Sequence, residues 1–159
     1  MLEADKVDLD DFDRRLLKLV QSDAGQTAEQ LAGNVGLSAS AVQRRLKRLR
    51  EAGVIIREAA VLDLKSLGSP TFFVTSLQIE REHPELIAQL RAWLMAQEHV
   101  QQIYYVTGQA DFVLVVTAPD AASYEALMAR LMSDNPNVRC FSTSMVLTVI
   151  KRSLAIPVP

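Results

Sequence analysis

The strongest chemical signal in this sequence is a run of basic residues. Residues 44–50 read Arg-Arg-Leu-Lys-Arg-Leu-Arg, five positive charges in seven residues with no acidic residue among them. Exposed helices usually mix both signs of charge, because opposite charges three or four residues apart attract each other. A run of one sign costs self-repulsion. We therefore interpret it as a surface for a polyanion such as double-stranded DNA, with an ordinary hydrated face as the alternative.

A helix through this run would have one apolar and one polar face. At about 100° per residue, Val42, Leu46 and Leu49 lie together and the basic residues lie mostly opposite. Arg45 lies nearer the apolar side, which favours a structural ion pair. The start of such a helix meets base edges in the major groove, where glutamine pairs with adenine and arginine with guanine.

The polar face therefore predicts the DNA contacts. The residues expected to read bases are Ser40, Gln43 and Arg44, at the start of the helix. Those expected to contact phosphates are Lys47, Arg48 and Arg50, and such contacts set affinity rather than sequence choice. Ser38 is predicted to cap the helix, and we include it in the DNA-binding set.

A second candidate site is the short turn Gly108-Gln109-Ala110, which precedes Asp111. Glycine lets a ligand approach the backbone closely. The free N–H groups of a turn suit a carboxylate, and Asp111 suits an ammonium group. In the alternative interpretation, Asp111 only caps the backbone of its own turn.

Other reactive residue types carry little signal. His83 and His99 stand at the two ends of one predicted helix without a second ligand, so we expect no metal site. The single cysteine, Cys140, has no histidine near it in sequence and favours a structural role. No phosphate-binding loop or nucleophile motif is present. We expect no cofactor and no catalysis.

Composition limits the broad class. The chain has 159 residues, a net charge of -2 and one cysteine. Any DNA binding must therefore come from a local patch, and no internal disulfide is possible, which fits the cytoplasm. No stretch approaches the roughly 18 apolar residues of a membrane span, so we expect no membrane partner.

The first half of the chain has the elements needed to position the basic run. Apolar residues at helical spacing predict a helix over 9–20, and shorter patterns predict helices over 28–34 and 38–52. Ala32, Gly36 and Val42 provide the small residue, the turn and the apolar anchor of a helix-turn-helix. Residues 54–62 are β-prone. We expect a winged helix-turn-helix domain over 1–62 and a linker over 63–70.

The second half alternates between strand and helix patterns. We predict strands over 72–79, 100–107, 111–117 and 138–150, with helices over 84–97 and 120–132. This β-α-β-β-α-β order is the ferredoxin-like arrangement, with both helices on one face of an antiparallel sheet. The fold class is therefore α+β, with a dimerising domain over 71–159 in which a second copy covers the other sheet face.

Several ordered motifs together resemble the Lrp/AsnC family of leucine-responsive, or feast/famine, transcription regulators. The matching segments are residues 9–17, 31–38, 44–49, 53–55, 106–112 and 143–151. The chain departs from the common pattern at Ala39, where many members have proline, and at Arg57-Glu58, which replaces Gly-Tyr. It also departs at Gln109-Ala110 in the predicted sensing turn.

The resemblance implies a specific function. Family members bind DNA as dimers, often assemble to octamers, and bind an amino acid or similar effector between dimers. Tyr105, Ser144 and Met145 match family positions associated with effector response. The predicted effector-binding residues are Tyr105, Thr107, Gly108, Gln109, Ala110, Asp111, Ser142, Ser144 and Met145.

A second function class is a ferredoxin-like metabolite-binding module or small enzyme that does not bind DNA. An enzyme would need converging acidic, basic or nucleophilic groups, and the second half offers little beyond Asp111, Tyr104 and Tyr105. A pure sensor would not need the basic run. We therefore favour a DNA-binding regulator.

Overall fold

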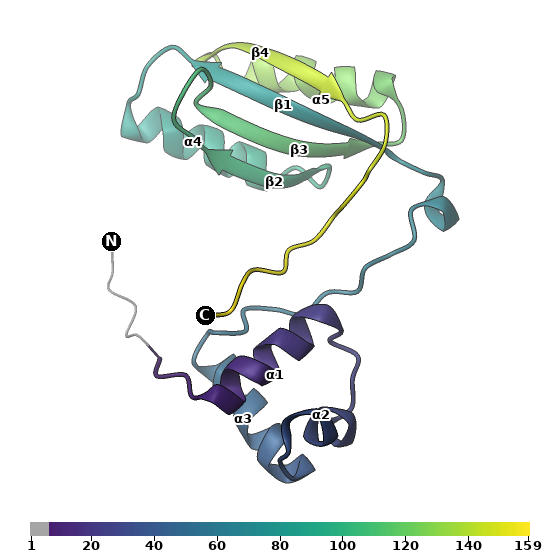
Figure 1. Ribbon diagram of the computed structural model, residues 1–159. Helices are drawn as coiled ribbons and strands as arrows, with labels where there is room; N and C mark the ends of the chain where they lie inside the picture. The colour runs from purple at the N-terminus through teal and green to yellow at the C-terminus, as the bar shows by residue number, and fades with distance from the viewer. Residues whose placement is uncertain (1–6) are drawn as a thin grey trace. The chain divides into compact units, whose positions relative to one another are not determined.

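The computed structural model describes residues 7–159, which form two compact units (Figure 1). The first unit contains the described residues up to Val61 together with Lys151–Pro159. The second contains Leu62–Ile150. The last nine residues, which we expected in the second domain, thus group with the first unit.

The first unit is built from α1 (Asp11–Ser22), α2 (Ala28–Val35) and α3 (Ala39–Glu51). The side chains of Asp10, Thr27 and Ser38 cap the starts of these helices, which satisfies N–H groups that have no partner within a helix. Gly36 ends α2 with φ 74°, a left-handed conformation that glycine adopts without strain.

Apolar residues of the three helices meet in one core. The buried members are Leu16, Leu17, Leu31, Ala32, Val35, Val42, Leu46 and Leu49. Val158 of the C-terminal tail packs against the same cluster. The spacing that predicted this core therefore identified its main contacts, except for the tail.

Residues 54–62, which we expected to be β-prone, form no strand. Val54 and Ile55 pack against the first core, whereas Ile56 and Val61 are 89% and 90% exposed. A strand needs another strand to accept its hydrogen bonds, and no segment within residues 7–159 pairs with this one. A high β propensity was therefore not enough to make residues 54–62 a strand.

The second unit contains a four-stranded sheet and two helices. In chain order its elements are β1 (Thr71–Ile79), α4 (Pro84–Met95), β2 (Val100–Tyr105), β3 (Phe112–Ala118), α5 (Ala121–Asp134) and β4 (Val138–Met145), preceded by a short 3-10 turn at Lys65–Leu67. The strand order is β2-β3-β1-β4, and all neighbours are antiparallel. The predicted β-α-β-β-α-β arrangement is confirmed.

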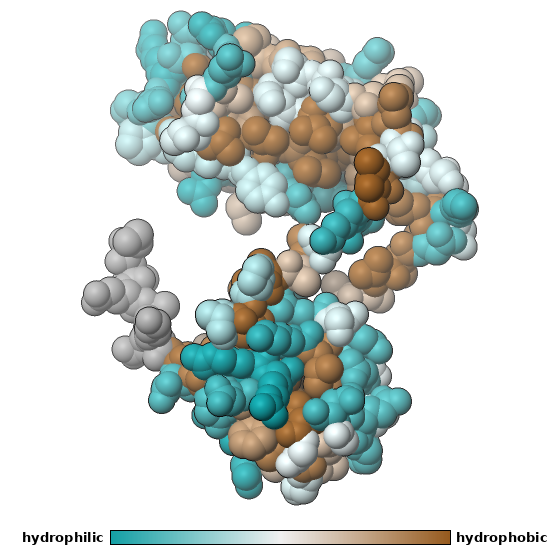
Figure 2. Space-filling model, in the orientation of Figure 1, coloured by the Kyte–Doolittle hydropathy of each residue, from teal (hydrophilic) through white to brown (hydrophobic). Residues whose placement is uncertain are grey.

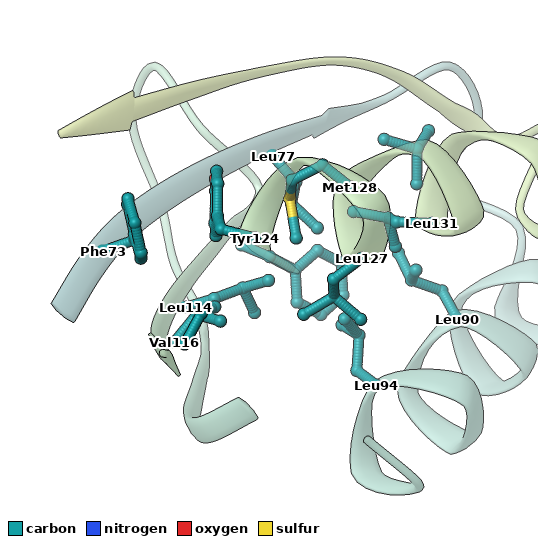
Figure 3. Packing of buried hydrophobic residues seen from close by; sticks show 13 residues of the cluster. Phe73, Leu77, Leu90, Leu94, Leu114, Val116, Tyr124, Leu127, Met128 and Leu131 are labelled. Atoms are coloured by element: carbon teal, nitrogen blue, oxygen red, sulfur yellow. The ribbon is translucent and has the colours of Figure 1, made fainter. Parts of the chain in front are cut away.

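The second core lies between the sheet and its two helices (Figure 3). On β3, Phe112, Leu114 and Val116 are fully buried while the residues between them are half-buried. Phe73 stacks on Tyr124 with ring centroids 4.0 Å apart, and the buried Thr75 hydroxyl lies 2.8 Å from the Tyr124 hydroxyl. α4 and α5 both pack against this face, so the other face of the sheet carries no helix of the second unit (Figure 1).

The last strand ends at Met145, five residues earlier than the predicted end at Ile150. β4 pairs only with β1, and Met145 lies opposite Phe73 near the start of β1. Beyond Val146, whose N–H donates to the Phe72 carbonyl, β1 offers no further partner. β2 likewise ends at Tyr105 rather than Thr107.

Candidate nucleic-acid interface and effector turn

α3 presents all the predicted DNA-binding residues to solvent. Ser38, Ser40, Gln43, Arg44, Lys47, Arg48 and Arg50 are each exposed. Ser38 also has a structural role, because its Oγ accepts a hydrogen bond from the Ala41 N–H at 3.2 Å and lies 3.1 Å from Ser40 Oγ. The polar side of the helix is therefore exposed from its N-cap, Ser38, onward.

A buried carboxylate joins α3 to α1. Asp13 has no exposed surface. Its Oδ1 accepts from Arg45 Nη1 at 2.9 Å, and its Oδ2 is paired with Arg48 Nη2. Arg45 also pairs with Asp10 at 2.6 Å. The ion pair expected for Arg45 is thus present, and Arg48 shares it.

The hydrogen bonds around this ion pair change the pKa values of Asp10 and Arg45. The pKa of Asp10 is lowered, chiefly by the hydrogen bond from the Asp13 N–H and next by the Arg45 side chain. The pKa of Arg45 is raised by its hydrogen bonds to Asp10 and Asp13. Because the folded pKa of Asp10 is depressed, its stabilising contribution is present above its unfolded pKa and is lost as pH falls through the folded value.

The other positively charged residues of α3 differ in whether they are paired with an acidic side chain. Arg50 pairs with Glu58 at 2.7 Å, and Lys47 lies 3.7 Å from Glu51. Exposed pairs of this kind contribute about 0–1 kcal/mol, so a phosphate can compete with them. Within residues 7–159, Arg44 has no acidic partner. Arg44 is therefore the least committed cation of the helix.

Sequence reasoning did not assign a role to Asp13. The signal was available, since Asp13 lies three and four residues before Leu16 and Leu17 and so falls on the apolar face of α1. A charge on a buried face needs a partner of opposite sign. The one-sign run on α3 was therefore partly a source of counter-charge for α1.

The predicted effector turn connects β2 to β3 and is attached to the end of β1. The Asp111 N–H donates to the Leu77 carbonyl at 2.9 Å, and Asp111 Oδ2 accepts from the Ile79 N–H at 2.8 Å. The Gln78 side-chain amide donates to the Gln109 carbonyl at 2.7 Å. The Asp111 carboxylate thus holds the turn against β1 rather than capping its own turn.

The turn leaves donors free for a ligand. In the part of the chain that the structure describes, the N–H groups of residues 107–110 donate to no protein acceptor. Gly108 has φ 123° and open space where a Cβ would lie. A ligand could therefore approach this backbone closely, whereas other residues would be strained there.

One chain does not bring all the predicted effector residues together. Tyr105 lies on β2, at one edge of the sheet, and the turn after it reaches the end of β1, while Ser142, Ser144 and Met145 lie on β4, at the opposite edge. Three strand spacings of about 4.8 Å separate these edges, roughly 14 Å. Ser142 lies opposite Ser76, but Met145 lies opposite Phe73, towards the other end of β1.

Among residues 7–159, no group of three or more histidine, cysteine, aspartate or glutamate side chains is arranged to hold a metal ion. In the same range, no helix combines the length and apolar character needed to cross a membrane.

A helix-turn-helix followed by a ferredoxin-like domain defines a class of two-domain transcription regulators. Two family models match the chain: a winged helix-turn-helix DNA-binding model over residues 9–56 and the Lrp/AsnC ligand binding domain over residues 72–156. The chain belongs to the Lrp/AsnC family. The resemblance seen in the sequence is confirmed, and so is the α+β fold class.

Curated relatives are similar over nearly their full length. A helix-turn-helix transcriptional regulator of Sinorhizobium fredii is 38% identical over 152 residues, which is 96% of this chain and 90% of that protein. The transcriptional regulator AzlB of Bacillus subtilis is 30% identical, covering 94% of this chain and 96% of AzlB.

Solved structures agree with the fold. An AsnC family regulator from Agrobacterium tumefaciens superposes with a TM-score of 0.87 at 28% identity, covering 94% of this chain and 97% of that one. A Neisseria meningitidis regulator, solved as a complex with L-methionine, gives 0.86 at 25% identity over the same shares.

The Asp13 ion pair yields a first prediction. Asp13→Ala should lower the free energy of unfolding of the first unit by about 1–3 kcal/mol, because it leaves two guanidinium groups at a partly buried site without their shared acceptor. Urea unfolding of the full chain, followed by circular dichroism at 222 nm (the helical signal), measures this. Asp11→Ala, at an exposed position of the same helix, is the matched control. Equal losses for the two variants would contradict the prediction.

Proposed function

We propose that this protein is a sequence-specific transcription regulator that binds double-stranded DNA through α3 and responds to a small effector held by its second unit. The observation that carries the proposal is the exposed face of α3. This face carries several positive charges. The helix is held against α1 by the ion pairs of Asp13 with Arg45 and Arg48. Such a face complements the phosphates and base edges of a major groove.

Individual residues are assigned by their position and freedom. Gln43 and Arg44 lie in the first half of α3, and Ser40 precedes them, so these three read base edges. Lys47, Arg48 and Arg50 contact phosphates: Arg50 by exchanging its Glu58 partner, and Arg48 through its remaining donors while it stays paired with Asp13. Ser38 mainly caps the helix.

The DNA assignment predicts different behaviour for two cations. Arg44→Ala should weaken binding to the preferred operator by about 1–3 kcal/mol and relax sequence choice, while random DNA is bound almost as before. Lys47→Ala should weaken binding to all duplexes alike and flatten the dependence on salt. Fluorescence anisotropy with an operator selected from random duplexes, at several salt concentrations, measures both.

Arg91→Ala serves as the control, because it removes one positive charge from an exposed position on α4 in the second unit. If Arg44→Ala weakens operator and random DNA equally, the base-reading role is wrong. If neither variant differs from Arg91→Ala, α3 is not the DNA-binding element.

We further propose that the effector is an amino acid or a closely related molecule bound at residues 107–111, beside Tyr105. The free N–H groups of the turn suit a carboxylate, and the remaining oxygen of Asp111 suits an ammonium. The Neisseria regulator and a feast or famine regulatory protein from M. tuberculosis, 28% identical to this chain, are each described as L-methionine complexes. Ser142, Ser144 and Met145 join the site from a second copy.

The effector proposal predicts that at least one of the twenty amino acids raises the melting temperature of the wild type. A ligand at about 100 times its Kd stabilises by roughly 2.7 kcal/mol. Asp111→Asn should remove most of this shift, because it deletes the charge while keeping an oxygen for the Ile79 N–H. Asp111→Ala should also lower the melting temperature without ligand.

Thermal-shift assays on the three proteins test this, and Asp120→Asn is a control whose carboxylate caps α5 instead. A wild-type response retained in Asp111→Asn would limit Asp111 to its structural role. No response to any amino acid in the wild type would contradict the choice of ligand class.

We also propose that the protein forms a homodimer that assembles further, to a higher oligomer such as an octamer. The sheet face opposite α4 and α5 carries Val74, Val113 and Val115, which lie side by side across β1 and β3. Figure 2 shows apolar side chains gathered in a band over the second unit. Exposed apolar patches of this kind mark contact surfaces.

Assembly predicts a dimer or larger species for the wild type in sedimentation equilibrium at micromolar concentration. Val74→Glu, at a position 38% exposed, should shift the protein towards monomer, because a charge would be buried without a partner. Ala126→Glu on the exposed side of α5 is the control. A monomeric wild type, or an unchanged Val74→Glu variant, would refute this interface.

The proposal also covers catalysis, cofactors, cellular location and domain limits. We infer a non-catalytic protein that needs no cofactor or metal and acts in the cytoplasm, where a bacterial-type regulator meets DNA. The relatives described above are named as transcriptional regulators. Domain limits of 1–62, 63–70 and 71–159 contain the two family matches, although Lys151–Pro159 packs with the first unit.

A further inference from the structure

A β-bulge lies beside the effector turn and displaces one arginine from the regular strand pattern. Gln78 of β1 pairs with Cys140 of β4, but the next residue, Ile79, pairs with Val138. Arg139 is therefore the extra residue of the bulge. Bulges are frequent next to functional sites, where they redirect a side chain out of the alternation of the sheet.

The redirected side chain is connected to the turn through one glutamine. Arg139 Nη2 donates to Gln78 Oε1, and Gln78 Nε2 donates to the Gln109 carbonyl at 2.7 Å. Gln78 Oε1 also accepts from Cys140 Sγ at 3.4 Å, so the amide oxygen is used by two residues of β4 and the amide nitrogen by the turn. This places the Arg139 guanidinium beside the loop whose N–H groups are free.

Arg139 holds an uncompensated positive charge. It is exposed, and among the described residues it forms no ion pair with any carboxylate. Its hydrogen bond to Gln78 uses one nitrogen of a group that carries five N–H donors. The outward donors remain available for a planar, bidentate acceptor, and a carboxylate is the acceptor that fits a guanidinium best.

We propose that Arg139 binds the carboxylate of the effector, together with the free N–H groups of residues 107–110, and that Gln78 is the positioning residue for both. The effector class is then a small molecule with a free carboxylate, not its amide or ester. This inference rests on the proposed effector role of the turn, and it adds two residues that neither the spacing of the sequence nor the resemblance indicated.

The test compares each amino acid that binds the wild type with its own α-carboxamide. Isothermal titration of the full chain with the twenty L-amino acids identifies the binding ones. Wild type should bind such an amino acid at least tenfold more tightly than its α-carboxamide. Arg139→Gln should lose at least tenfold in affinity for the acid and bind acid and amide about equally.

Three further variants sharpen the result. Arg139→Lys should recover part of the preference for the acid, because it restores the charge without the planar fork. Arg91→Gln, which removes an exposed arginine from α4, should bind like the wild type. Gln78→Met should reduce the acid-over-amide preference while leaving Arg139 in the chain, and Gln78→Glu should reduce it further by neutralising the guanidinium.

The outcomes separate this inference from the proposed function. If the wild type binds an amino acid and Arg139→Gln keeps both its affinity and its preference for the acid, the inference is overturned while the effector site stands. If no amino acid binds the wild type, the amino-acid effector and the carboxylate contact both fail. Unchanged melting of ligand-free Arg139→Gln establishes that any loss of binding does not come from unfolding.

Discussion

The buried carboxylate of Asp13 is the interaction on which the DNA-binding unit depends. A charge without exposed surface is tolerated only if it is paired and hydrogen-bonded, and Asp13 meets this condition with Arg45 and Arg48 from a single helix. Two contacts one helical turn apart on α3 restrict both its rotation and its position against α1. The opposite face, with Arg44 at its start, is thereby held outward. The charges that stabilise the unit therefore also orient the face that we propose binds DNA.

In the second unit, hydrogen bonds rather than ion pairs hold the candidate site in place. The turn between β2 and β3 is attached to β1 by the Asp111 N–H, the Asp111 carboxylate and the Gln78 amide. These bonds hold the base of the turn and the Gln109 carbonyl, and in the described part of the chain the N–H groups of residues 107–110 have no protein acceptor. A turn that is fixed in place needs little further ordering on binding, which is the property expected of the effector site that we propose.

Local patterns in the sequence predicted the elements well, and tertiary pairing explains what they missed. Helical spacing and capping residues such as Thr27 identified α1 to α3, and alternating strand and helix signals identified the ferredoxin-like order. The missing strand at 54–62 and the early end of β4 both depend on whether a partner strand is present, which no local propensity encodes. The candidate sites likewise combine features set by local sequence with contacts between distant residues. The exposed face of α3 followed from its periodicity, whereas the pairing of Arg48 with Asp13 and the approach of Arg139 to Gln78 join residues at least 35 positions apart.

The C-terminal tail gives the chain a second connection between the two units. Gln21 of α1 exchanges two hydrogen bonds with the backbone of Ile156, at 2.8 and 3.1 Å, and Arg14 Nε donates to the Pro159 carbonyl at 2.9 Å. In sequence, the second unit is therefore an insertion whose two ends both lead into the first unit. The tail attaches to α1, and α1 is the helix that holds α3 through Asp13. β4 is thus connected to α1 through the tail and its hydrogen bonds, in addition to the chain that joins α3 to β1. A regulator whose chain ended with the second unit would have only the connection that follows α3.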